Sequence, residues 1–182
     1  MQSGKILFDL YESTSEARAH WQVWWALANQ AKPRLVGQMN RFPDFFLASE
    51  RAHFNSIFIN LAHAFDKRRD VASIERYLRA ANKIYNPTEV ASFRSRLQHH
   101  EAIIAGVMEI RNNSIAHKSA GLTEKQVFAN AKIRPRQIQV LIEEVTSMVN
   151  QFAEREGWPQ RIFTSDRVSK ATLGLVEAIP ER

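Results

Sequence analysis

The stretch from Arg111 to His117 combines residue types that suit phosphate chemistry. Its arginine stays positively charged and can grip a phosphate through two parallel hydrogen bonds. Its histidine titrates near neutral pH, so the imidazole can take up or release a proton. Asn112 adds an amide directly beside the guanidinium group. Together these residues suit a reaction in which one group moves a proton while another stabilises charge on phosphorus.

A single copy of this stretch makes a poor site on a regular helix. There, Arg111 and His117 would point about 120° apart. Two copies related by a two-fold axis can instead contribute both pairs to one shared cleft, because such an interface joins the same patch of each subunit. We therefore expect a homodimer. In the alternative interpretation, Arg111 pairs with an acid such as Glu109 or Glu124, and His117 stabilises the end of its helix.

The elements that position this stretch are predicted to be helices. Ser13 and Glu16 form a capping-box pattern that predicts a helix over 14–31, ending before a proline. A second helix is expected from Pro43 to about residue 65 and carries two apolar stripes, so it should be central and largely buried. Its second stripe consists of Phe45, Ala48, Ala52 and Ile59.

The helix that carries the motif has the most complete start signal in the chain. Residues 86–89 (Asn-Pro-Thr-Glu) combine an Asn cap, a first-turn Pro and an acid at the third helical position. We expect one long helix from there through Arg111 to about Gly121. A shorter helix that runs through Ile74, Leu78 and Ala81 should precede it, with Asp70 as its cap.

The last clear helical pattern begins at Pro135 and ends at Gly157, after a capping-box pattern at Thr123 and Gln126. Beyond it, the apolar residues show no secure period. We therefore predict one helical domain over 1–157 and a C-terminal arm or tail over 158–182 that is packed on it or partly mobile.

Composition supports one globular domain and excludes several kinds of site. The chain has 182 residues, 45% of them hydrophobic, and no cysteine, so disulfides, thiolate metal sites and iron–sulfur clusters are excluded. Glycine-rich phosphate loops and metal-binding motifs are absent, and adjacent His99 and His100 lack metal-ligand spacing, so we expect no cofactor and no metal. The net charge of +6 favours anionic partners. No apolar run reaches membrane-spanning length and no signal peptide is evident, so we expect a cytoplasmic protein without membrane contact.

Residues 111–117, Arg-Asn-Asn-Ser-Ile-Ala-His, resemble the Arg-x(4–6)-His motif of HEPN domains (higher eukaryotes and prokaryotes nucleotide-binding). Arg111, Asn112 and His117 match the motif position by position, including the polar residue that commonly follows the arginine. The order of helices before the motif is similar to the phage abortive-infection (AbiU-like) branch of the family. The resemblance covers most of residues 10–155.

This resemblance implies an all-α bundle of about five to six helices that dimerises around the motif. In active members it implies a metal-independent endoribonuclease, in which His117 is the general base, Arg111 stabilises the phosphorane and Asn112 orients the histidine or the phosphate. The implied partners are RNA or a nucleotide and, in toxin systems, a nucleotidyltransferase-type antitoxin. Two alternatives remain open at this point. One is a non-catalytic HEPN module that binds nucleotide, RNA or protein, and the other is a structural helical protein.

Overall fold

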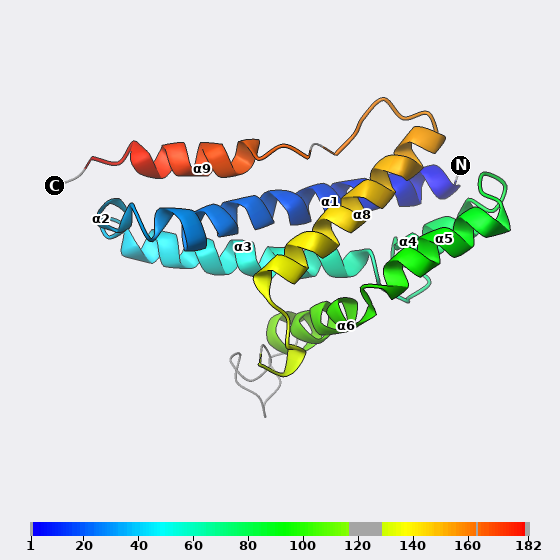
Figure 1. The fold of residues 1–182 in the computed structure, drawn as a ribbon, viewed down its shortest axis with the longest axis horizontal. Helices are drawn as coiled ribbons and strands as arrows, with labels where there is room; N and C mark the ends of the chain where they lie inside the picture. Colours follow the sequence, from blue (N-terminus) through cyan, green and yellow to red (C-terminus); the bar gives the residue numbers. More distant parts are fainter. Residues whose placement is uncertain (1, 117–128, 163, 181–182) are drawn as a thin grey trace.

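The computed structural model describes residues 2–116, 129–162 and 164–180. Throughout these residues the regular structure is helical and no strand occurs, as the sequence predicts. Two long helices, α1 (Gln2–Trp25) and α3 (Pro43–His63), run side by side (Figure 1). A third long helix, α8 (Pro135–Arg155), packs across α1.

The main core lies where α1, α3 and α8 meet. Leu10 of α1, Phe58 of α3 and Val145 of α8 are all inaccessible to solvent. On α8 the buried residues recur at helical spacing, which confirms the predicted helix that begins at Pro135. Gly157 follows its end with φ +73°, a conformation that glycine adopts without strain.

The predicted start of the first helix is wrong. The helix α1 begins at Gln2, and Ser13 lies in its interior, where its hydroxyl donates a hydrogen bond to the carbonyl of Asp9 at 2.9 Å. Such a back-bond gives a serine a partner inside a helix, so it need not be a cap. Leu7 is fully buried in the core, which explains why the helix extends so far upstream. At its other end α1 continues as a π-helical segment, η1 (Ala26–Ala31), so the predicted end at residue 31 is confirmed.

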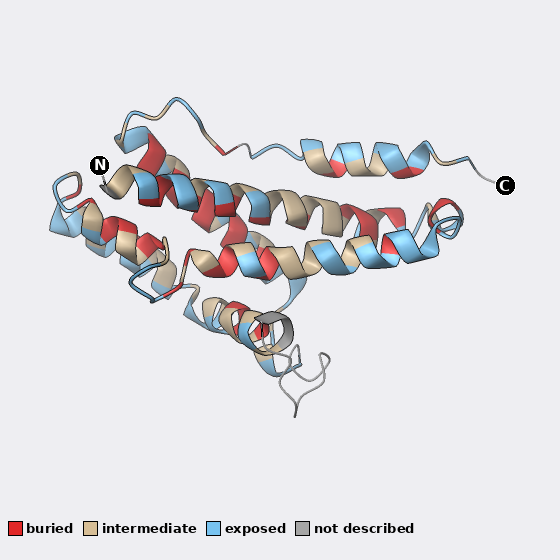
Figure 2. Ribbon diagram, turned by 180° about the vertical axis from the view of Figure 1, so that it is seen from behind, coloured by how far each residue is buried: buried red, intermediate tan, exposed pale blue. Residues whose placement is uncertain are grey.

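The bounds predicted for the second helix are confirmed by α3, but its predicted burial is wrong. Phe46 and Phe58 are buried, whereas Phe45 is 61% exposed. The remaining members of the second stripe, Ala48, Ala52 and Ile59, are exposed as well. Helix α3 therefore buries one face in the core and leaves the other exposed (Figure 2), and the apolar second stripe lies on that exposed face.

A short helix, α4 (Ile74–Ala80), follows the loop after α3. Its cap is Ser73, whose side chain accepts a hydrogen bond from the backbone N–H of Arg76. The prediction that Asp70 caps this helix is wrong, because the helix begins further along the chain and Asp70 lies in the loop before it.

The capping box at Asn86 and Glu89 is confirmed, and it opens α5 (Pro87–Gln98). The single long helix expected to follow is wrong. The chain breaks at residues 99–100, and a separate helix, α6 (Glu101–Ile110), begins there. The break lets α6 pack against α3 and bury part of its apolar face.

The C-terminal segment contains a further helix, α9 (Arg167–Glu177), which lies along α1 and η1 (Figure 1). It closes a second apolar cluster through Val176, which packs with Leu27, Phe46 and Met39 of the short helix α2 (Val36–Met39). Among the described residues, no helix combines the length and apolar character that a membrane span requires.

Candidate functional site

The motif begins where α6 ends. Residues Arg111–Ala116 form a π-helical segment, η2, that contacts α3. The 120° argument for a regular helix does not apply to such a segment, and π-helical turns are frequent at functional sites. His117, the predicted proton-transfer group, lies outside the described residues, as do Gly121, Thr123, Glu124 and Gln126.

The guanidinium group of Arg111 is held between a carboxylate and an amide. Its Nη2 lies 4.0 Å from Oδ2 of Asp66, in the loop that follows α3. Its Nη1 donates a hydrogen bond to Oδ1 of Asn112 at 2.8 Å. The described acid that pairs with Arg111 is thus Asp66, and not Glu109 as in the alternative interpretation. The structure therefore brings two of the three predicted site residues together.

Asp66 is the residue around which the site is organised. It is 6% exposed and accepts hydrogen bonds from the backbone N–H of Arg68 at 2.9 Å and from the Arg68 Nε at 3.2 Å. Burial by itself raises the pKa of Asp66, but the hydrogen bonds from Arg68 and the charges of Arg68 and Arg111 outweigh it, so the pKa lies below 3.8. At neutral pH, Asp66 is a carboxylate shared by two guanidinium groups.

Sequence reasoning missed Asp66 as a site residue. A signal was present: this acid directly follows a strongly apolar helix end and precedes three cations, Lys67, Arg68 and Arg69. A carboxylate that close to a core has to be paired, because an unpaired buried charge is costly. Only the fold could show that its partner is Arg111 of η2.

Arg111 and Asn112 open onto a cavity of about 620 Å³ between the α3–α4 loop and α6. Apolar side chains and the cations Lys67 and Arg68 form most of its wall. The residues that line it are Phe65, Asp66, Lys67, Arg68, Glu101, Ile104, Ala105, Met108, Arg111 and Asn112. A cavity lined by these side chains can receive a phosphate beside the Arg111 guanidinium.

No group of three or more His, Asp or Glu side chains in the described parts of the chain is arranged to hold a metal ion. His99 and His100 stand at the joint between α5 and α6, and His99 Nδ1 lies 2.6 Å from the Ser95 carbonyl oxygen. The charged side chains that line the cavity beside Arg111 are three cations and two carboxylates: Lys67, Arg68, Arg111, Asp66 and Glu101.

Comparison with known proteins places the chain in a family. Neither the curated proteins nor the solved structures include a match. The family model HEPN_AbiU2, described as AbiU2, matches residues 5–154, which include α3, nearly all of α1 and α8, and the whole of residues 111–117. Since the match spans most of the chain and agrees with the predicted resemblance, the protein belongs to the HEPN_AbiU2 family.

Proposed function

We propose that the protein is a metal-independent endoribonuclease of the toxin or phage-defence type, with a site formed by the motifs of two copies. The observation that carries the proposal is the position of Arg111 and Asn112 on a cavity that Lys67 and Arg68 also line, with the Arg111 guanidinium paired to the buried carboxylate of Asp66. A guanidinium held by a buried carboxylate is oriented before substrate arrives, which is the arrangement that charge stabilisation requires.

The reaction suited to these groups is cleavage by the ribose 2′-hydroxyl. One copy of His117 removes the 2′-OH proton, the 2′-oxygen attacks phosphorus, and the bond from phosphorus to the 5′-oxygen breaks. The second copy of His117 gives a proton to the departing 5′-oxygen, which leaves a 2′,3′-cyclic phosphate and a 5′-hydroxyl. Arg111 neutralises charge on the phosphorane, and Asn112 orients His117 or the phosphate. Asn112 also accepts a hydrogen bond from Arg111. DNA lacks the nucleophile, so it should not be cut.

This proposal includes a homodimer, an RNA substrate and a cytoplasmic setting. A nucleotidyltransferase-type antitoxin is a further proposed partner. It would restrain the activity by covering the cavity or by chemically modifying residues of the site. The cations around the cavity also favour a second function, a non-catalytic module that binds RNA without cleaving it.

Incubation of the purified protein with mixed RNA in EDTA tests the first function directly. We expect the wild type to cleave and His117→Ala to lose roughly 10²–10⁴ in rate. Arg111→Ala should lose a similar factor, since one charge-stabilising donor is commonly worth about 10²–10³. The matched controls are His99→Ala and Arg34→Ala, two exposed residues that do not line the cavity.

The controls should cleave at the wild-type rate, and they and His117→Ala should melt close to the wild-type temperature. Arg111→Ala should melt somewhat lower, because it loses the ion pair with Asp66. A wild type that binds RNA but leaves it intact in EDTA would contradict the nuclease assignment and support the binding module. Equal cleavage by His117→Ala and wild type would remove the histidine from the mechanism.

A further inference from the structure

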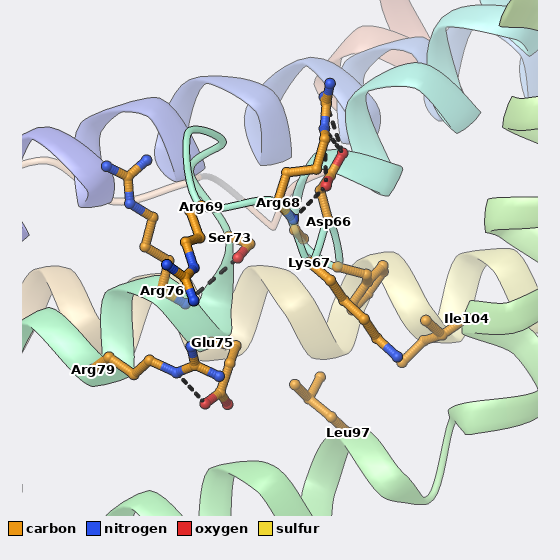
Figure 3. A pocket seen from close by; sticks show the side chains of 12 residues that line it. Asp66, Lys67, Arg68, Arg69, Ser73, Glu75, Arg76, Arg79, Leu97 and Ile104 are labelled. Carbon is orange, nitrogen blue, oxygen red and sulfur yellow. Dashed lines mark hydrogen bonds and ion pairs between the residues drawn. The ribbon is translucent and has the colours of Figure 1, made fainter.

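A second cavity of about 580 Å³, drawn in Figure 3, adjoins the one beside Arg111. It lies between the α3–α4 loop, the helix α4 and the joint between α5 and α6. The two cavities share one wall, which consists of residues 65–68 and Ile104. A chain molecule bound beside Arg111 would therefore have a second compartment within immediate reach.

The floor of this second cavity is apolar. Leu97 of α5 and Ile104 of α6 point into it, and Ala64 and Phe65 complete the apolar part of the wall (Figure 3). Leu97 and Ile104 are half-buried, so each keeps an apolar surface free for contact. The break between α5 and α6 sets these two side chains on neighbouring sides of the cavity. Such a floor suits a flat, weakly polar group such as a nucleobase.

Three cations on the same wall lack a carboxylate partner. Lys67, Arg69 and Arg76 form no ion pair with any other described residue, and the side chains of Lys67 and Arg69 are well exposed. Arg68 differs, because Asp66 neutralises it at 3.2 Å. These three cations therefore carry positive charge that is available to an anion.

The second carboxylate of the wall is already neutralised. Glu75 accepts hydrogen bonds from Arg79 at 3.0 Å and from Arg94 at 2.7 Å. The hydrogen bond from Arg94 is the main cause that lowers its pKa, and Arg79 adds to it against the opposing effect of burial. Glu75 thus stays ionised and paired, and it does not cancel the charge of Lys67, Arg69 and Arg76.

From this arrangement we infer that the second cavity binds a nucleotide of the RNA next to the one whose phosphate lies at Arg111. Its base rests on Leu97 and Ile104, and its phosphate and the neighbouring phosphates of the strand contact the three cations Lys67, Arg69 and Arg76. The inference rests on the proposed function, because it is the shared wall with the Arg111 cavity that makes the bound molecule a continuing RNA strand.

Binding is measured with a short, fluorescein-labelled RNA that carries 2′-O-methyl groups and so cannot be cleaved. The triple variant Lys67→Ala, Arg69→Ala, Arg76→Ala should bind more weakly, and its slope of log affinity against log salt should fall by about 2, since each single-strand phosphate contact contributes roughly 0.7. The control is Lys5→Ala, Arg34→Ala, Lys83→Ala, which removes three exposed cations that line neither cavity.

The floor is tested separately by Leu97→Ala, which should weaken binding about tenfold. Leu175→Ala, at a residue that is 65% exposed on α9, should leave the affinity unchanged. In the cleavage assay the triple cation variant should raise KM with kcat unchanged, because the cavity holds substrate and transition state equally. Thermal melting of each variant shows whether a loss of binding reflects unfolding.

Failure of the inference and failure of the nuclease proposal give different results. If the wild type cleaves RNA and the triple variant binds like its control, the second cavity is not a nucleotide site and the nuclease stands. If the wild type does not cleave while the triple variant still loses affinity and salt slope, the nuclease proposal fails and the cavity is upheld as an RNA-binding site. A wild type that does not bind the labelled RNA overturns both.

Discussion

At the scale of single residues, the site depends on one buried carboxylate. Asp66 receives the backbone N–H and the guanidinium of Arg68 and lies within ion-pair distance of Arg111. It thereby ties the loop after α3 to the start of the motif. Arg111 has no described acid on its own helix as a partner, so its direction depends on a residue from another element.

We predict that Asp66→Asn lowers the free energy of unfolding at neutral pH by about 1–3 kcal/mol, because two guanidinium groups lose their shared anion. The pKa of Asp66 is lower in the folded state, so its carboxylate adds stability above pH 3.8 that is lost as the pH falls through the folded pKa. The difference between wild type and variant should therefore shrink towards acid pH. Urea denaturation from neutral pH down to about pH 3 measures it.

Asp70→Asn is the matched control, since Asp70 lies in the same loop and is exposed. It should change the free energy of unfolding by no more than about 0.5 kcal/mol. Equal effects of the two substitutions would show that Asp66 is not the anchor.

Two histidines make a second, independent prediction. The Nδ1 atoms of His20 on α1 and His53 on α3 lie 2.7 Å apart, so one ring donates a proton that the other accepts. Burial lowers the pKa of both, the charge of His20 lowers that of His53 further, and Glu16 only partly opposes the shift at His20. The folded state therefore binds fewer protons than the unfolded state does.

This pair contributes stability above pH 6.5 that is lost as the pH falls through the folded pKa values. We expect the melting temperature of the wild type to fall between about pH 7.5 and pH 5, and the fall to be smaller in His53→Gln. Melting curves across this range check it, with His99→Gln as the exposed control. A pH profile that is the same in both variants would contradict the prediction.

At the scale of elements, α6 approaches the segment before α8 so closely that one position has to be glycine. A Cβ at Gly106 would lie 2.5 Å from Cδ1 of Ile133 and 2.9 Å from the backbone oxygen of Ala131. The side chain of Ile133 can shift, but the backbone oxygen cannot move without moving the segment before α8. Gly106 thus allows the helix that ends at Arg111 to pack where it does.

We predict that Gly106→Ala destabilises the protein by about 1–3 kcal/mol, even though alanine is the better helix former. The matched control is Gly174→Ala on α9, where a Cβ would meet no atom within 4 Å. That change should stabilise by roughly 0.5–1 kcal/mol through helix propensity alone. Denaturant unfolding compares the two, and changes of the same sign would contradict the close packing of α6.

At the scale of the whole molecule, the proposed mechanism needs two copies. We expect sedimentation to show a dimer at about 10 µM, because a specific interface of roughly 800 Å² per partner usually survives such dilution. Activity per chain should then fall when the protein is diluted below the dissociation constant of the dimer. A monomer whose activity per chain is independent of concentration would exclude a shared site.

Local signals were enough to predict much of the fold. The caps at Asn86 and Glu89, and the period between Pro135 and Gly157, act over one or two helical turns, so they can be recognised without knowledge of the fold. The family resemblance likewise depended on a short contiguous motif at residues 111–117 and on the order of the predicted helices before it, and both can be recognised from the sequence alone. Its proton-transfer role at His117 stays a prediction, as does the homodimer.

Other features were decided only by the tertiary structure. Ser13 could cap a helix or hydrogen-bond back to a carbonyl inside one, and the choice depends on whether the segment before it packs into the core. Leu7, in that segment, is fully buried, so Ser13 lies inside the helix. The break at residues 99–100 allows α6 to pack against α3, so it depends on a helix that lies elsewhere in the chain. The pairing of Asp66 with Arg111 joins two elements that are far apart in the chain. Local propensities and caps describe a residue and its nearest neighbours, whereas burial and ion pairing depend on which distant segments the folded chain brings together.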